Sequence, residues 1–334
     1  MNDFVVCARR VKQGAFNAEP GPSHMLVVPA NSLAPLPNHG RMGDTWVKAW
    51  LQQLLAEATW GIDERTGALR GDILVYVHGY NNDAPEVIRR HRRLQTDLKA
   101  LGWKGALVSF DWPSDNKTVG YLEDRHDAKQ SAMQLVTDLI ALLAAKQTPD
   151  CAINTHIIAH SMGAYVVREA FDDADDARLE NNCWMISQLC LIGADVSASS
   201  FSDGHASSDS LYRHCTRLTN YFSFGDSVLK LSNVKRAGVA PRAGRVGLPE
   251  FAPKKAVDID CSLYHQALLA DPALQTRDQA QGFLGNRDHS WFIGNRVFTL
   301  DLFETLKGDL DHRILPTRNL IEGSRRLSLT PVGL

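Results

Sequence analysis

The sequence lacks the features that mark nucleic-acid-binding and membrane-spanning proteins. Its 334 residues include 36 Lys and Arg against 38 Asp and Glu, so the formal net charge is −2 and there is no basic excess for nucleic acid. No segment approaches the roughly 18 to 20 apolar residues that span a membrane. The N-terminus has no basic leader followed by an apolar core, which is the pattern of a secretory signal. We therefore expect a cytoplasmic protein with no nucleic-acid partner and no membrane span.

Cofactor and metal signatures are also absent. There is no glycine-rich phosphate loop, no dinucleotide-binding fingerprint and no group of His, Asp and Glu at metal-ligand spacing. The six cysteines contain no Cys-x-x-Cys pair and lie mostly in apolar runs, which favours buried free thiols in a reducing compartment. We expect neither a cofactor nor a metal, and the sequence leaves the oligomeric state open.

Strand and helix patterns alternate through the middle of the chain. Hydrophobic residues make up 44% and charged residues 22%, which is ordinary for a globular protein. The expected strands are residues 73–77, 106–110, 153–159, a segment within 184–194, 218–224 and 256–261. The expected helices are one opened by Asp83 and closed by Gly102, and residues 127–146, 163–171 and 297–306. Because nearly all of these strands are apolar, we predict an α/β fold with a mostly parallel sheet and helices on both faces.

The first part of the chain departs from this alternation. Residues 4–11 and 25–29 are short β-rich runs, and a Pro/Gly turn at residues 19–22 lies between them. Asp44 then precedes a helical pattern. We expect antiparallel strands and one helix over residues 1–71.

The C-terminal residues 313–334 show no strong periodicity and predict a loosely held tail. No linker rich in Pro, Gly or Ser divides the chain. We therefore expect a single domain over residues 1–334, with its core at about residues 72–306.

The most informative segment is residues 156–167, which shows a strand, then Ala159-x-Ser161-x-Gly163, then a helix. A serine at a tight strand-to-helix turn projects its hydroxyl above the sheet, and the crowded turn needs small residues two before and two after it. The N-terminus of the following helix favours a developing oxyanion. A serine that merely caps a helix is the alternative interpretation.

This segment resembles the nucleophile elbow of the α/β-hydrolase superfamily, in the Ala-x-Ser-x-Gly form. Residues 75–82, 110–114 and 194–196 (VYVHGYNN, FDWPS and ADV) are similar to a bacterial branch of esterase- and lipase-like hydrolases, known as domain of unknown function nine hundred. The resemblance covers roughly residues 72–306. It implies an α/β-hydrolase fold and hydrolase chemistry, and Ala159 stands where the superfamily most often has Gly.

A serine nucleophile needs a base, and the base needs an orienting acid. In α/β-hydrolases the chain order is Ser, acid, His. Asp226 follows the second expected strand after Ser161, where the acid most often lies, and Gly225 gives that turn backbone freedom. We predict Asp226 as the acid and keep Asp195, which ends the preceding strand, as the alternative.

Three histidines follow Asp226. His289 lies in a loop just before the terminal helix, where this fold presents its base, and we predict it as the catalytic base. His265 lies in a helical run and is expected to be packed or exposed without a catalytic role. His312 lies in a charged stretch and is expected to be solvated.

The oxyanion hole needs two backbone donors, which we predict to be the N–H groups of Met162 and Tyr80. His78 and His160 are expected to be structural, His78 by bracing the loop and His160 by pointing away from Ser161.

Trp112, with Tyr80, is a possible wall of an acyl pocket, and an ordinary core aromatic is the alternative. Residues 263–288 are expected to cover part of the site.

These residues predict a serine hydrolase of the carboxylesterase or lipase-like kind, acting through an acyl-enzyme on a small-molecule ester or acyl substrate. A thioesterase, amidase or acyltransferase would use the same triad. A non-catalytic binding protein on this fold is the alternative from another class.

Overall fold

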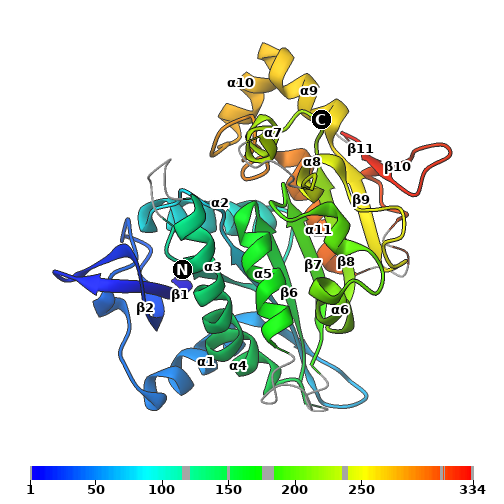
Figure 1. The fold of residues 1–334 in the computed structure, drawn as a ribbon. Coiled ribbons are helices and arrows are strands. Elements are labelled where there is room, and N and C mark those ends of the chain that lie inside the picture. The colour runs from blue at the N-terminus through cyan, green and yellow to red at the C-terminus, as the bar shows by residue number, and fades with distance from the viewer. Residues whose placement is uncertain are drawn as a thin grey trace.

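The computed structural model describes residues 2–114, 121–148, 151–174, 184–234, 240–308, 311 and 313–331. Within them an 11-stranded sheet runs through the molecule (Figure 1) in the order β10-β11-β9-β8-β7-β6-β4-β5-β1-β2, and β3 pairs with β4. The strands are β1 (Asp3–Lys12), β2 (Ala15–Val28), β3 (Thr59–Ile62), β4 (Leu69–Val77), β5 (Ala106–Asp111), β6 (Cys151–His160), β7 (Ile186–Ile192), β8 (Cys215–Phe222), β9 (Ala256–Asp260), β10 (Arg318–Leu320) and β11 (Leu327–Leu329).

The longer helices are α1 (Asp44–Ala58), α2 (Ala84–Ala100), α3 (Tyr121–Gln134), α5 (Met162–Asp173), α6 (Ala206–Arg213), α7 (Ser227–Val234), α9 (Ser262–Ala270), α10 (Pro272–Ala280) and α11 (Arg296–Lys307). The short elements are η1 (Pro37–His39), the π-helix η2 (Leu135–Ile140), α4 (Ala141–Ala144), η3 (Ala198–Phe201) and α8 (Ala243–Val246). The helix predicted over residues 127–146 is thus α3, η2 and α4 in succession.

The central strands of the sheet are parallel, from β5 through β4, β6, β7 and β8 to β9. β1 is parallel to β5, and β2 is antiparallel to β1. All 6 residues of β5 are buried, as its unbroken apolar pattern predicts for a strand that is covered on both faces. The fold is therefore of the predicted α/β class, with a mostly parallel sheet and an antiparallel N-terminal start.

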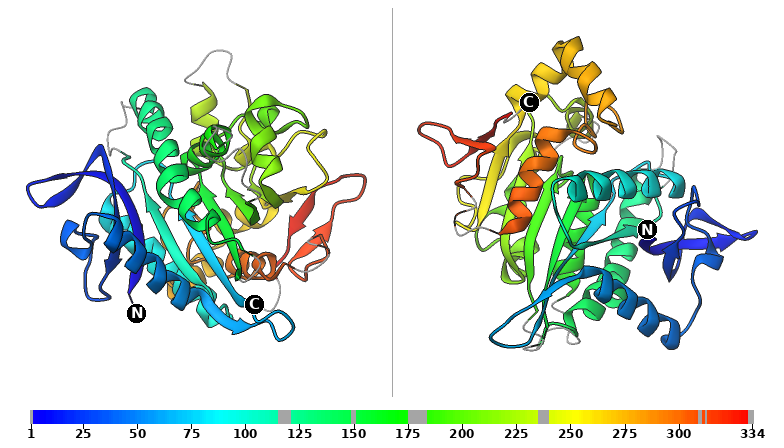
Figure 2. Two further views of the ribbon diagram at one scale, coloured as in Figure 1. Left: turned by 90° about the horizontal axis from the view of Figure 1, so that it is seen from below. Right: turned by 180° about the vertical axis from the view of Figure 1, so that it is seen from behind.

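Helices cover both faces of the sheet (Figures 1 and 2). Trp50 of α1, Leu135 of η2 and Phe171 of α5 belong to the core on one face. Leu94 of α2 and Phe298 of α11 belong to the core on the other. Helices α7, α9 and α10 gather where the parallel strands end, at the top of Figure 1. Among the described residues, no helix combines the length and the apolarity that crossing a membrane requires.

The N-terminal hairpin turns at Gln13 and Gly14, so the turn predicted at residues 19–22 is wrong. Gln13 and Gly14 have positive φ angles of 52° and 79°, which a two-residue hairpin turn favours. Pro20 instead lies inside β2, opposite Arg9, where the pairing register shifts. Because β2 is an edge strand, a proline there removes no hydrogen bond to a further strand.

The predicted loose tail over residues 313–334 is also wrong for the part that the structure describes. β10 and β11 extend the sheet beyond β9, and Leu327 of β11 is fully buried. The buried guanidinium of Arg318 donates two hydrogen bonds to the Asp301 carboxylate of α11, at 2.7 and 2.9 Å. Strands of three residues carry no periodicity to detect, and a long-range ion pair helps to set their position.

Candidate active site

Ser161 lies at the sharp turn between β6 and α5, with φ of 55° and ψ of −122°. This conformation is rare for a residue with a side chain. A Cβ atom on Gly163 would lie 2.5 Å from the carbonyl oxygens of both Val77 and His78, so no larger residue fits there without movement. Ala159, two residues before Ser161, is fully buried. The small residues of the motif thus allow α5 to pack closely against the end of β4.

Neighbouring segments hold the backbone of Ser161 in this conformation. Its N–H donates to the carbonyl oxygen of Ile192, at the end of β7, at 2.9 Å. Its own carbonyl oxygen accepts from the N–H groups of Ala164 and Asp195, each at 3.1 Å. The strained turn is therefore tied to the next strand of the sheet.

Three side chains from distant parts of the chain meet at this turn. The His289 Nε2 atom lies 2.7 Å from the Ser161 Oγ, and the His289 Nδ1 lies 2.6 Å from the Asp226 Oδ2. The other Asp226 oxygen accepts from the N–H of Leu229 at 2.9 Å, at the start of α7. The N–H of His289 donates to the Asn286 Oδ1 at 2.8 Å, which fixes its loop. The three side chains predicted as nucleophile, base and acid are thus brought together in that order.

Asp195 lies in a different environment from Asp226. Its carboxylate forms an ion pair with the Arg242 Nε at 2.9 Å, and both side chains are about 5% exposed. Its backbone N–H holds Ser161, as described above. Asp226, rather than Asp195, is therefore the carboxylate in contact with the histidine.

Two glycines near the Asp195–Arg242 ion pair, Gly193 and Gly244, were not predicted from the sequence to shape the site, whereas Gly225 was. Gly225 does not adopt a positive φ, so the freedom predicted for it is not used. Gly193 has a positive φ of 53°, and a Cβ on Gly193 would lie 3.2 Å from the His289 Cε1. A Cβ on Gly244 would lie 2.1 Å from the N atom of Ala194. Gly193 thus leaves room for the imidazole, and Gly244 allows its backbone to pack against residues 193 and 194.

Residues 55–256 match the family described as "Alpha/beta hydrolase of unknown function" (DUF900). This chain belongs to that family. The match includes Ser161 and Asp226, whereas β1, β2 and His289 lie outside it.

Other proteins are similar to this chain only in part or distantly. An uncharacterised protein of Nostoc sp. is 45% identical over 62 residues, which are 19% of this chain and 15% of that protein. Esterase B of Lactobacillus rhamnosis has a TM-score of 0.33 at 10% identity, over 70% of this chain and 75% of that chain. An esterase of Rhizomucor miehei has a TM-score of 0.32 at 11% identity, over 83% of this chain and 80% of that chain.

The loop after β4 lies against Ser161. A Cβ on Gly79 would lie 2.9 Å from the Cβ of Ser161. The Gly79 carbonyl oxygen lies 2.7 Å from the His78 Nδ1 and accepts from the Asn82 Nδ2 at 2.8 Å. Tyr80 follows in this half-buried loop, and Met162 opens α5 directly after Ser161. The two predicted oxyanion donors therefore lie on segments next to Ser161.

Two of the other histidines, His160 and His265, are packed side chains near this centre. The His160 ring lies against that of His289, with centroids 4.9 Å apart. Burial and the charges nearby lower the pKa of His160 well below its usual range, so its ring is neutral there. His265 is buried and its Nδ1 lies 2.8 Å from the Ser223 Oγ. His312 lies outside the described residues.

Trp112 is a core aromatic, so the pocket wall considered for it is not observed. Its side chain has no exposed surface, its ring stacks on that of His78 at 5.4 Å, and its Nε1 donates to the His78 carbonyl oxygen at 2.7 Å. Helices α9 and α10, from the segment expected to cover part of the site, lie at the same end of the sheet as α7 (Figure 1). In the part of the chain that the structure describes, no three His, Cys, Asp or Glu residues are grouped to hold a metal ion.

The close packing at Gly163 predicts that a larger residue there destabilises the fold. Gly163→Ala places a methyl group against two backbone oxygens, so we expect the free energy of unfolding in urea to fall by about 1–3 kcal/mol. Gly61→Ala is the matched control, because its Cβ meets nothing within 4 Å and its change should stay within about 0.5 kcal/mol. Equal stability of the two variants would contradict this account of the turn.

Proposed function

We propose that this hydrolase is a serine hydrolase that cleaves carboxylic esters through an acyl-enzyme intermediate. Ser161 attacks the ester carbonyl while His289 accepts its proton and later delivers it to the leaving alcohol. Asp226 orients the imidazole. The N–H groups of Met162 and Tyr80 hold the oxyanion, and water activated by His289 then releases the acid.

The observation that carries the proposal is the pair of contacts made by His289. A proton on Nδ1 that is shared with Asp226 leaves the Nε2 lone pair directed at the Ser161 hydroxyl, which is the arrangement that activates a serine. All three side chains are largely buried, which strengthens the electrostatic interactions among them.

Exposed apolar side chains beside Asp226 favour an ester substrate with an apolar acyl group. Phe224 and Val228 flank Asp226 in the sequence and are 46% and 40% exposed. Leu263, at the start of α9, is 78% exposed, and Phe224 is tied to that helix by its N–H, which donates to the Ser262 Oγ. An acyl chain leaving the catalytic centre on this side would cover apolar surface.

The first experiment measures hydrolysis of p-nitrophenyl esters of graded acyl length. We expect the kcat/KM of the wild type to rise with chain length from acetate, because each buried methylene contributes about 0.8 kcal/mol. Ser161→Ala should lower the rate by at least about 10³-fold. Parallel thioester and anilide substrates test the thioesterase and amidase alternatives. No turnover of any substrate by folded wild type would favour a binding protein.

The second experiment compares the two carboxylates. Asp226→Asn favours the wrong imidazole tautomer and should lower kcat by about 10⁴-fold. Asp195→Asn should leave most of the turnover per folded molecule, because Asp195 contacts Arg242 instead of His289. The folded fraction of each variant is measured by circular dichroism at the assay temperature. A larger loss of kcat in Asp195→Asn would contradict the assignment.

A further inference from the structure

We propose that Arg9 and Asp111 are positioning residues, which hold the loop after β4 so that the Tyr80 N–H faces the oxyanion. The inference rests on the proposed function. It makes the N-terminal hairpin, which lies outside the region matched by the family, part of what the active site requires.

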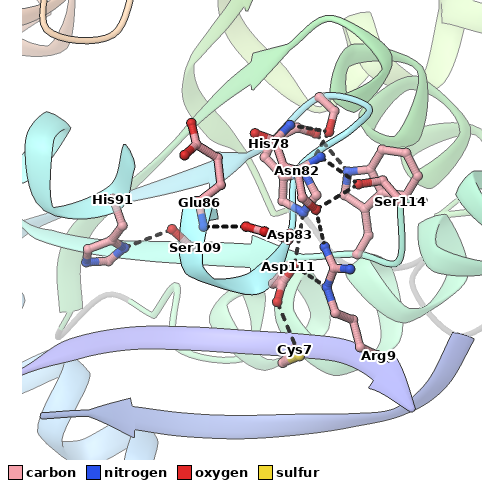
Figure 3. A network of polar contacts seen from close by, with 12 residues as sticks. Cys7, Arg9, His78, Asn82, Asp83, Glu86, His91, Ser109, Asp111 and Ser114 are labelled. Atoms are coloured by element: carbon pink, nitrogen blue, oxygen red, sulfur yellow. Dashed lines mark hydrogen bonds and ion pairs between the residues drawn. The ribbon is translucent and has the colours of Figure 1, made fainter. Parts of the chain in front are cut away.

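A continuous set of buried contacts links β1 to this loop (Figure 3). The Arg9 Nε donates to the Asp111 Oδ1 at 2.7 Å, and its second guanidinium nitrogen donates to the Asn82 carbonyl oxygen at 2.7 Å. The same Asp111 oxygen lies 3.1 Å from the His78 Nε2. Arg9 thus bonds one end of the loop directly and reaches the other end through Asp111 and His78.

These contacts converge on one peptide group. His78 Nδ1 and Asn82 Nδ2 both approach the Gly79 carbonyl oxygen, and Asn82 Nδ2 also donates to the Tyr80 carbonyl oxygen at 2.9 Å. In a planar trans peptide the C=O and the next N–H point in opposite directions. Holding the Gly79 oxygen toward the network therefore directs the Tyr80 N–H the opposite way, away from the network.

The charges in the network balance each other. Burial raises the pKa of Asp111, but the Arg9 charge and the His78 contacts outweigh this, so the carboxyl is ionised at neutral pH. Arg9 is 2% exposed and Asp111 is fully buried. A buried ion pair contributes little net stability compared with apolar packing, because desolvation offsets its attraction. Orientation of the loop is a function for which the fixed geometry of a guanidinium is well suited.

The test uses full-length variants and two inhibitors. Arg9→Met removes both guanidinium bonds, and Arg9→Met combined with Asp111→Asn avoids leaving a buried charge unpaired. We expect kcat/KM for p-nitrophenyl acetate to fall by about 10- to 100-fold in both variants. The reason is that the Tyr80 N–H, one of the two oxyanion donors, would be held less well and would lose part of its effect. The Ki of a trifluoromethyl ketone, which forms an oxyanion on Ser161, should rise by the same factor. The Ki of the matching ether, which forms none, should change by less than about threefold.

The matched control is Arg318→Met combined with Asp301→Asn. This pair is also fully buried but belongs to β10 and α11, so it should change stability without changing kcat/KM per folded molecule. Wild-type kinetics in the folded Arg9 variants would overturn the inference and leave the proposed function intact. A wild type that neither hydrolyses esters nor binds the ketone covalently would overturn both.

Discussion

The strained backbone of Ser161, with its positive φ, is the constraint on which the site depends. That conformation places the hydroxyl at the end of β6, and Gly163 lets α5 approach the carbonyl oxygens of Val77 and His78 at and just after the end of β4. The ends of β4 and β7 then lie on either side of Ser161. From this follow the positions of the loop after β4, of Asp195 and of the imidazole beside Gly193.

Much of this arrangement could be predicted from local sequence. The apolar strands, the helices between them and the crowded motif around Ser161 each depend on residues close in the chain, so periodicity and residue size reveal them. The order Ser, acid, His and the count of strands after Ser161 predicted Asp226 and His289. The structure places His289 against Ser161 and Asp226 against His289. The ion pair between Asp195 and Arg242 could not be predicted, because Arg242 lies far along the chain.

The features that sequence reasoning missed depend on long-range partners. The Pro/Gly segment looked like a turn because its residues favour turns, yet the positive φ angles at Gln13 and Gly14 make the hairpin. The C-terminal strands are too short for a pattern. A buried ion pair lies toward each end of the sheet. Arg9 of β1 pairs with Asp111 of β5, and Arg318 of β10 pairs with Asp301 of α11. No local pattern pairs such residues.

The central claim is that Ser161 is a nucleophile activated by His289. The most direct test is mass spectrometry of the intact protein after reaction with a fluorophosphonate, followed by peptide mapping. The account predicts one phosphonyl adduct per chain, located on Ser161, and much slower formation in His289→Gln. An unmodified Ser161 in folded protein, or an adduct on another residue, would contradict it.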